Sequence, residues 1–592
     1  MKTDVNILLG GAAGSGIEKT GRLISLSFVR GGYYVFANIE HMSQIRGGNN
    51  FLRIRVADEF KQCHVEKCDI VIALDAKTVE EHADEITEGG VVVYDGEVVK
   101  FSDTTAAVLK AKKVLLADAP LKKLAVEKFG NPVMANTISL GIVFGLVDFD
   151  LGIPKAALKG IFGGKSAEII TSNEKALDLG FGMAKEKWSK DFMHKLAGGG
   201  AKSTGAKAAG AAGAAGKMFL MGNDAACIGA VKAGVKYVGE YPMTPSSSVL
   251  HFMAKWAKEY GVVVKHTEDE IAAVNSVIGA GFAGARSLSG TSGGGFALMT
   301  EGIGLASMNE VPIVIFEVMR PGPATGLPTR TEAADLRQII HAGQADANKI
   351  VLLPGDINEC FEFGFMAFNL AEKYQLPVIV SYDKYLGEGY YTVAPFETKG
   401  MKINRGKLLT QKELDKISDY KRYLRTEDGV SPRVIPGMKG GIHRATSDEH
   451  NEYGEICETA ENRKLMTEKR MKKMEVAMPE LPKPEIIGDK KADITFVTWN
   501  SAKGACLEAC EELKGRGIKA NVLQIKTAWP FLKKETVELI KQCKRPIVVE
   551  QNYTAQMGGL IAECTGILIE EKILKYDGRP FTAKFILDNL KS

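Results

Sequence analysis

Short apolar runs alternate along most of the chain with longer stretches whose apolar positions recur at helical spacing. Runs that are apolar on both faces, with helices of about ten or more residues between them, are typical of parallel sheets. The predicted strands are 5–9, 70–74, 91–94 and 114–117 in a first block, 311–316 and 376–380 in a second, and 494–498, 520–525 and 546–550 in a third. The pattern therefore predicts an α/β protein built from three α/β domains with mainly parallel sheets.

Two segments of different composition separate these blocks. Residues 197–216 consist almost wholly of Ala and Gly, so they cannot form a core and are interpreted as a flexible tether. Residues 400–490 begin with a Lys- and Arg-rich sequence of helical pattern. They end in a Pro-rich stretch that favours an extended connector. The basic stretch 463–473 within them is interpreted as a solvated helix face. The expected division is a first domain 1–195, a linker 196–217, a second domain 218–400, a connector 401–490 and a third domain 491–592.

Composition narrows the class of protein further. Of 592 residues, 45% are apolar and 25% are charged, which is the balance of a soluble globular chain. The longest uncharged apolar stretch, 133–147, is interrupted by polar residues and is shorter than the about 20 residues that a membrane helix needs. The N-terminal residues do not resemble a signal peptide, so we expect a cytoplasmic location. The net charge of +4 comes from scattered basic residues and predicts no nucleic-acid partner.

Cysteine and glycine usage bear on the chemistry. The nine cysteines include no Cys-x-x-Cys pair, so the sequence predicts neither a zinc ribbon nor a self-contained iron–sulfur site. The chain contains 64 glycines, a share of about 11% against about 7% on average, which predicts many tight turns or close approaches to ligands.

Two glycine-rich loops stand in the first block. The run Gly-Gly-Ala-Ala-Gly-Ser-Gly at 10–16 lies between a strand and a helix, where backbone amides bind anions well. It matches neither the dinucleotide fingerprint nor a Walker loop, and a tight turn without ligand explains it equally well. At 43–48, Arg46 stands beside Gly47 and a second glycine, which suits phosphate or carboxylate capture, although a surface arginine is the plain alternative.

The second block carries four distinctive segments at strand–helix junctions. They are Tyr-Pro-Met-Thr-Pro-Ser-Ser at 241–247, the acidic cluster 268–270 that opens a helix of small residues over 271–286, a predicted flexible turn at 290–295, and a Pro- and Gly-rich loop at 320–329. Loops after the carboxyl ends of parallel strands are where α/β proteins bind ligands. By itself Glu270 would only complement the helix dipole, but three other distinctive loops favour a binding site.

These motifs together resemble those of the 2-oxoacid:ferredoxin oxidoreductases. The chain is most similar to an alpha subunit in which a gamma-type domain precedes the thiamine pyrimidine-binding domain. The runs at 10–17 and 43–49 resemble the gamma portion. Trp-Pro-Phe at 529–531 and Gln-Met-Gly-Gly-Leu at 556–560 resemble a domain like the transketolase C-terminal domain.

The resemblance implies roles for particular residues. Glu270 corresponds to the acid that holds ring nitrogen N1′ of thiamine diphosphate and favours its imino tautomer. Thr244 and Arg320 correspond to the residues that bind the carboxylate of the 2-oxoacid, with a turn hydroxyl and a surface ion pair as the structural alternatives. The cofactor-binding set is completed by residues of the same loops: Tyr241, Pro242, Gly293 and Gly294. For coenzyme A the weaker candidates are Gly14, Gly16, Arg46 and Gly47.

The chain lacks the family's Gly-Asp-Gly motif for the diphosphate-bound metal and any cysteine pattern for a four-iron–four-sulfur cluster. The resemblance therefore implies a beta subunit that carries Mg²⁺ and the cluster, ferredoxin as electron acceptor, and a heterodimer or a dimer of heterodimers. No metal site is expected on this chain.

The favoured interpretation is the alpha subunit of a 2-oxoglutarate:ferredoxin oxidoreductase, which forms succinyl-CoA and CO₂ or runs in reverse. Pyruvate and broad or branched-chain 2-oxoacid specificity stay open. Arg330 and Arg337 are candidates for a second cation that a dicarboxylate would need, although solvated helix charges explain them equally well. A more remote alternative is a non-catalytic protein that binds a nucleotide or coenzyme A through the loop at 10–16.

Overall fold

The computed structural model describes residues 4–42, 48–161, 166–196 and 216–591. The chain divides into two compact units, of which the first comprises residues 1–220 and 389–395 and the second comprises residues 221–388 and 396–592. The predicted tether, except for its last residue, lies outside the described residues.

The first unit is built on a mixed sheet of eight described strands, in the order β6-β5-β4-β1-β3-β2-β14-β7. Strands β1, β4, β5 and β6 pair in parallel, whereas β3 pairs antiparallel with β1 and with β2, and β14 pairs antiparallel with β2. The strands are β1 (Asp4–Gly11), β2 (Tyr34–Glu40), β3 (Asn50–Ala57), β4 (Cys68–Ala73), β5 (Ile86–Tyr94), β6 (Leu115–Asp118), β7 (Met218–Met221) and β14 (Tyr390–Val393). The helices are α1 (Ile17–Arg30), α2 (Ala76–His82), η1 (Ala83–Glu85), α3 (Asp103–Ala111), α4 (Leu121–Phe129), α5 (Met134–Leu146), α6 (Gly152–Ile161) and α7 (Ala167–Lys187).

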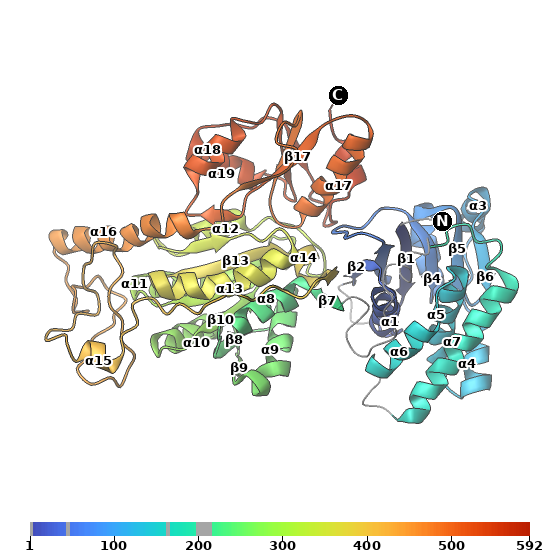
Figure 1. Ribbon diagram of the computed structural model, residues 1–592, viewed down its shortest axis with the longest axis horizontal. Coiled ribbons are helices and arrows are strands. Elements are labelled where there is room, and N and C mark those ends of the chain that lie inside the picture. The colour runs from blue at the N-terminus through green and yellow to red at the C-terminus, as the bar shows by residue number, and fades with distance from the viewer. Residues whose placement is uncertain (1–3, 43–47, 162–165, 197–215, 592) are drawn as a thin grey trace. The chain divides into compact units, whose positions relative to one another are not determined.

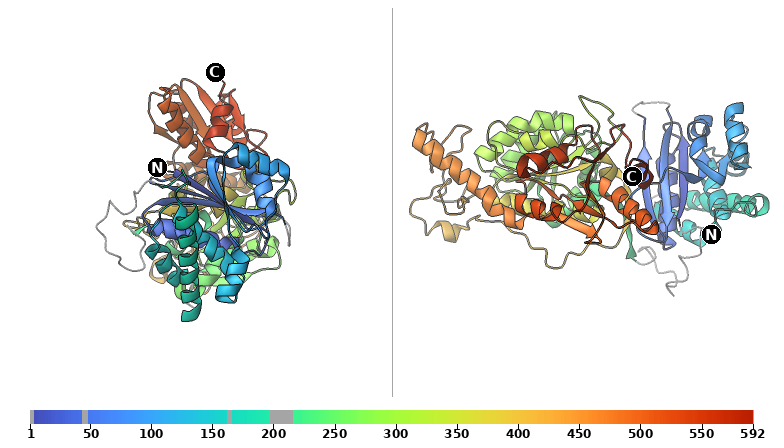
Figure 2. Two further views of the ribbon diagram at one scale, coloured as in Figure 1. Left: turned by 90° about the vertical axis from the view of Figure 1, so that its right-hand side faces the viewer. Right: turned by 90° about the horizontal axis from the view of Figure 1, so that it is seen from above.

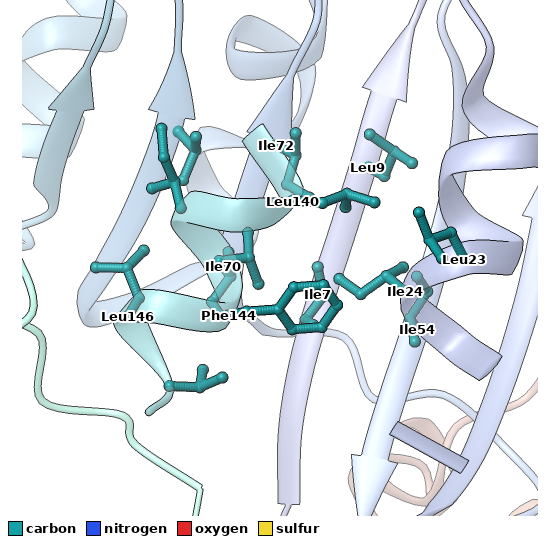
Figure 3. Packing of buried hydrophobic residues seen from close by; sticks show 14 of the residues in the cluster. Ile7, Leu9, Leu23, Ile24, Ile54, Ile70, Ile72, Leu140, Phe144 and Leu146 are labelled. Carbon is teal, nitrogen blue, oxygen red and sulfur yellow. The ribbon is translucent and has the colours of Figure 1, made fainter. Parts of the chain in front are cut away.

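Helix α5 lies at the centre of this unit's core. Phe144 and Leu140 of α5 pack against isoleucines of β1 and β4, and Ile24 of α1 packs beside them (Figure 3). No single helix among the described residues is long and apolar enough to cross a membrane, and α4 and α5 meet that length and composition only as a pair bent by 114°. The apolar stretch at 133–147 is thus largely a buried core helix.

Strands β2 and β3 are absent from the sequence-based strand assignment, because β3 carries charged residues and does not form an apolar run. Arg55 Nε donates to Asp4 Oδ2 at 2.8 Å, and Arg53 pairs with Glu85 at 2.7 Å. Paired arginines can lie in a covered strand because each charge has a partner.

The second unit contains two sheets. The larger one has the strand order β18-β12-β13-β11-β10-β8-β9 and is parallel except for the edge strand β18 (Figure 1). The strands are β8 (Tyr237–Glu240), β9 (Val263–His266), β10 (Ser287–Thr291), β11 (Ile313–Met319), β12 (Ile350–Leu352), β13 (Pro377–Asp383) and β18 (Thr527–Trp529). The helices are α8 (Gly222–Lys232), α9 (Ser247–Tyr260), α10 (Glu270–Phe282), α11 (Gly293–Met308), α12 (Leu336–His341), α13 (Ile357–Tyr374) and α14 (Lys384–Glu388), followed by α15 (Gln411–Leu414), α16 (Ala460–Ala477) and η3 (Met478–Glu480).

The third sheet has the order β15-β17-β16-β19-β20 and is parallel except for β15. Its strands are β15 (Glu485–Gly488), β16 (Ile494–Thr498), β17 (Ala520–Gln524), β19 (Pro546–Glu550) and β20 (Lys572–Leu574). Its helices are α17 (Ala502–Gly515), α18 (Lys533–Ile540), α19 (Gln556–Thr565) and α20 (Ala583–Asp588). The prediction of three α/β domains with mainly parallel sheets is confirmed.

The position of helix α16 shows that one interpretation of the sequence, a solvated helix face at 463–473, is wrong. The helix extends from the body of the second unit beside the irregular segment that contains α15 (Figures 1 and 2). The stretch 463–473 is not a solvated face, because Lys469 and Lys473 are buried and pair with Glu310 at 2.5 and 2.9 Å. Sequence pattern missed this because the acid that neutralises the lysines lies about 160 residues earlier.

Candidate functional site

The predicted site residues of the second block follow four neighbouring strands. Strands β9, β8, β10 and β11 lie side by side in the order of the sheet. Glu270 begins the helix after β9, Tyr241 and Thr244 follow β8, Gly293 follows β10, and Arg320 follows β11. Because parallel strands end at the same edge, this topology brings all four loops to one edge of the sheet.

Glu270 is the first residue of α10, and the Asp269 carboxylate caps that helix by accepting from Ala272 N at 2.7 Å. The Glu270 side chain is buried, and its Oε1 accepts no hydrogen bond within the described part of the chain. Burial raises the pKa of the Glu270 carboxyl, the Asp269 charge raises it further, and the Arg320 charge opposes them. A buried acid with an open oxygen is suited to hold a proton or to meet a ring nitrogen.

The glycines at 293–295 form the first turn of α11, and not the flexible turn that the sequence predicted. A Cβ on Gly295 would lie 2.3 Å from Glu270 Oε1 and 2.3 Å from Thr291 Oγ1. A Cβ on Gly293 would lie 2.3 Å from Asp335 Oδ2, whereas Gly294 is exposed and opens toward the carbonyl of Ala324. Gly293 and Gly295 are therefore required by close packing of carboxyl groups against the start of a helix.

Arg320 and Thr244 are in direct contact. Arg320 Nη1 donates to the backbone oxygen of Thr244 at 2.6 Å. Burial lowers the pKa of the Arg320 guanidinium, while the charges of Asp335 and Glu270 raise it. This contact joins the loop after β11 to the loop after β8.

Tyr241 and Pro242 are half-buried at the start of the loop after β8. The Tyr241 ring lies 6.2 Å from the His266 ring at the end of β9. Asn223 Nδ2 donates to Pro245 O at 3.0 Å, which anchors the far end of the same loop to α8.

Two further residues close to the site escaped the sequence analysis. Asp335 stands just before α12, and Glu317 lies inside the buried strand β11. The signal for Glu317 was a charged residue within an apolar strand. Nothing in the sequence indicated that Asp335 would lie against it.

Arg330 and Arg337, the two candidates for a second cation, lie in different surroundings. Arg337 on α12 pairs with Glu563 at 2.6 Å and is half exposed, as a surface ion pair would be. The pKa of Arg330 is lowered to about 10 by burial and by the Arg579 charge.

The glycine loop of the first unit is a strand–helix turn. Gly14 and Gly16 have φ values of 84° and 88°, and Gly16 precedes α1 directly. Asn136 Nδ2 donates to Ser15 O at 2.8 Å and holds the loop in place. The positive φ values account for both glycines by backbone conformation. Arg46 and Gly47 lie outside the described residues.

Three family matches cover most of the chain. Residues 6–183 match the family described as pyruvate ferredoxin/flavodoxin oxidoreductase, and residues 228–470 match its thiamine-diphosphate-binding domain. Residues 492–584 match core domain II of pyruvate:ferredoxin oxidoreductase.

Relatives that match over nearly their whole length indicate the same family. The alpha subunit of a 2-oxoacid:ferredoxin oxidoreductase from Saccharolobus solfataricus is 32% identical, over 99% of this chain and 97% of the relative. The alpha subunit of 2-oxoacid:ferredoxin oxidoreductase 1 from Aeropyrum pernix is 35% identical, over 98% of this chain and 96% of the relative. A solved structure, the 2-oxoglutarate:ferredoxin oxidoreductase from Magnetococcus marinus with 2-oxoglutarate, coenzyme A and succinyl-CoA bound, is 30% identical with a TM-score of 0.88 over 99% of both chains.

The chain belongs to the 2-oxoacid:ferredoxin oxidoreductase family. Within the family it is an alpha subunit with a gamma-like domain fused at its N-terminal side.

Proposed function

We propose that the chain is the alpha subunit of a 2-oxoglutarate:ferredoxin oxidoreductase, which converts 2-oxoglutarate, coenzyme A and oxidised ferredoxin to succinyl-CoA, CO₂ and reduced ferredoxin, or runs in reverse. The assignment of 2-oxoglutarate as substrate rests on the likeness, over 99% of both chains, to a structure with 2-oxoglutarate bound. The relatives from Saccharolobus and Aeropyrum are named only for 2-oxoacids, so the second candidate is an enzyme for pyruvate or for broad or branched-chain 2-oxoacids.

The residues at the sheet edge fit thiamine diphosphate. Glu270 offers a buried carboxyl oxygen without a donor, and Gly294 leaves open space at the start of α11. In this proposal Glu270 holds N1′ of the pyrimidine ring, and Tyr241, Pro242, Gly293 and Gly294 line the cofactor. When bound, the cofactor supplies the nucleophilic carbon and the electron sink for decarboxylation.

Arg320 and Thr244 bind and orient the carboxylate of the 2-oxoacid in this proposal. The contact between Arg320 and the Thr244 backbone holds the cation at the loop after β8, and half-burial strengthens its attraction for an anion. A fixed cation lowers the entropy lost when the substrate is oriented.

The remaining parts come from a partner in this proposal. The chain contains no Gly-Asp-Gly motif and no Cys-x-x-Cys pair, so Mg²⁺ and the four-iron–four-sulfur cluster are assigned to a beta subunit. The active complex is a heterodimer or a dimer of heterodimers that delivers electrons to ferredoxin. For coenzyme A the proposed contacts are Gly14, Gly16, Arg46 and Gly47 of the first domain, 1–195. The domain limits given above for the linker, second domain, connector and third domain are kept as part of this proposal.

The test is to purify the native complex and to measure viologen reduction with coenzyme A and each 2-oxoacid in turn. A brown complex that contains a second subunit and prefers 2-oxoglutarate supports the proposal. Preference for pyruvate or branched-chain 2-oxoacids would overturn the substrate while leaving the reaction class intact. A colourless chain without thiamine-dependent activity would overturn the catalytic role.

A further inference from the structure

A fully buried acid lies at the base of the loop after β8. Glu240 is the last residue of β8, its side chain is 0% exposed, and its Oε2 accepts no hydrogen bond within the described part of the chain. No cationic side chain among the described residues acts on this carboxyl group. Because an ionised carboxylate without a counter-charge is very costly inside a protein, the surroundings of Glu240 favour the protonated acid.

The contacts of the Ser246 hydroxyl indicate the same protonation state. Ser246 Oγ lies 2.7 Å from Met243 O and 3.5 Å from Glu240 Oε1. A hydroxyl group has one proton, and the closer contact takes it because a carbonyl oxygen can only accept. The longer contact is then a hydrogen bond only if the Glu240 carboxyl donates its own proton to Ser246 Oγ. The two side chains are therefore matched as donor and acceptor when the acid is neutral.

Gly290 on β10 leaves the space that this carboxyl group occupies. A Cβ at Gly290 would lie 2.6 Å from Glu240 Oε2 and 3.0 Å from Oε1, so a side chain there would displace the acid from Ser246. The other titratable groups that face Glu240 are Cys227 on α8 and Tyr382 on β13. Burial raises the pKa of both, so they are neutral and leave the acid without a nearby charge.

One short turn connects this acid to the candidate site. Met243 O accepts from Ser246 N at 2.8 Å as well as from Ser246 Oγ, and these two bonds close the turn 243–246 around Thr244. Thr244 O in turn accepts from Arg320 Nη1 at 2.6 Å. The direction in which the Arg320 guanidinium points therefore depends on how this turn is held.

We propose that the protonated carboxyl group of Glu240 donates a hydrogen bond to Ser246 and thereby holds the turn 243–246 in the form that orients Arg320 toward the carboxylate of the 2-oxoacid. This inference rests on the proposed role of Arg320. Glu240 is a positioning residue, because it is fully buried and acts through Ser246 and Thr244.

The experiment measures kcat and KM for the 2-oxoacid in the alpha–beta complex. Glu240→Met keeps an unbranched side chain of similar length but removes the donor, so we expect KM to rise about threefold to tenfold with kcat changed less. Glu240→Gln carries an amide N–H that replaces the carboxyl O–H, so its KM should equal the native value. Glu259→Gln, at an exposed position on α9, is the matched control and should also keep the native KM.

Ser246→Ala tests whether the acid acts through the hydroxyl. Its KM should rise at least as much as that of Glu240→Met, and adding Glu240→Met to Ser246→Ala should raise KM no further, because both changes break the same contact. A native KM in Glu240→Met, or additive rises in the double variant, would overturn the inference. A raised KM in Glu240→Gln would contradict the protonated form of the acid.

Arg320→Ala separates this inference from the proposed function. If Arg320→Ala leaves KM unchanged, Arg320 does not bind the substrate, and the proposed site fails together with this inference. If it raises KM while Glu240→Met keeps the native KM, only the positioning role of Glu240 fails.

Thermal unfolding at several pH values tests the proton without turnover. Burial raises the pKa of Glu240, and an acid whose pKa is raised by folding costs stability above about pH 4, where the unfolded chain loses the proton. That cost grows as the pH rises and is absent in Glu240→Gln. The Tm of Glu240→Gln should therefore gain on the native Tm between about pH 5 and about pH 8. A difference in Tm that stays constant or shrinks with rising pH would overturn the proton on Glu240.

Discussion

At the scale of single residues, the candidate site combines acids and glycines that depend on one another. Glu270 Oε1 has no donor, and it has room only because Gly295 carries no side chain, since a Cβ there would lie 2.3 Å from that oxygen. The carboxyl group remains buried with a raised pKa, which suits the role that we propose for it, holding the ring nitrogen of the cofactor. The chemistry of the acid thus depends on the small size of its neighbour.

Glu270→Gln tests the acid. The amide has the same shape but cannot favour the protonated ring nitrogen, so we expect turnover in the reconstituted complex to fall by about 10²-fold or more while assembly is unchanged. Viologen reduction and size-exclusion chromatography measure the two properties. Glu268→Gln, at an exposed position of the same acidic cluster, is the control and should keep full activity. Normal turnover in Glu270→Gln would remove the assignment of this acid.

Gly295→Ala tests the packing. The added Cβ meets Glu270 Oε1 and Thr291 Oγ1, so the carboxyl must move and we expect loss of cofactor-dependent activity. Isothermal titration with thiamine diphosphate and the turnover assay measure the effect. Gly279→Ala on α10, where a Cβ has open space, should keep activity and gain about 0.5–1 kcal/mol of stability. Equal behaviour of the two variants would show that Gly295 is not required by Glu270.

At the scale of elements, α16 shows how a charged helix becomes part of a core. Glu310 precedes β11 and is fully buried, and its carboxylate pairs with Lys469 and Lys473. Those two lysines and Arg422 hold the pKa of Glu310 far below its ordinary value, while burial lowers the pKa of Lys473 to about 7. One acid therefore anchors the helix against the second sheet by compensating more than one cation.

Glu310→Gln tests this anchor. It leaves buried cations without a counter-charge, so we expect a loss of about 3–5 kcal/mol in the free energy of unfolding. Lys473→Met should cost clearly less, because Lys469 and Arg422 still face Glu310. Lys472→Met, at an exposed position of the same helix, is the control and should change little. Chemical denaturation ranks the three variants, and a mild effect of Glu310→Gln would contradict the anchoring role.

At the scale of the whole molecule, the chain does not keep each sheet within one stretch of sequence. After the second sheet it returns at β14 to pair with β2, and the Thr392 hydroxyl bonds both to Val35 N at 2.9 Å and to Val35 O at 3.1 Å. Strand β18 likewise leaves the C-terminal region to extend the second sheet at β12. Strands β14 and β18 thus bring distant parts of the sequence into common sheets.

Thr392→Val tests the first return. The isosteric change leaves the buried Val35 groups without the hydroxyl, and we expect the first unit to lose about 1–3 kcal/mol. Hydrogen exchange at β2 and β14, followed by mass spectrometry, measures the loss locally. Thr398→Val, at an exposed position nearby, should leave exchange unchanged. If both variants exchange alike, the hydroxyl does not stabilise this pairing.

How far the sequence predicted the molecule varies with the kind of feature. Strands 494–498 and 546–550 were predicted at their observed bounds, because apolar runs between helices are a local signal. Strand β3 was missed since Arg53 and Arg55 interrupt its apolar run, and their partners Glu85 and Asp4 are distant in sequence. The sequence singled out Glu270, Thr244 and Arg320 because strand ends and unusual loops are local signals, and the structure brings their loops to one edge of the sheet.

The sequence by itself determined the three α/β domains, the family and the loops that meet at one sheet edge. These follow from local hydrophobic periodicity and from motifs a few residues long. Only the tertiary structure decided that Gly295 packs on Glu270, that Gly293 packs on Asp335, and that Lys473 is buried against Glu310. The reason is physical: whether a charged side chain is solvated or buried depends on which partner the fold brings to it, and that partner can lie anywhere along the chain.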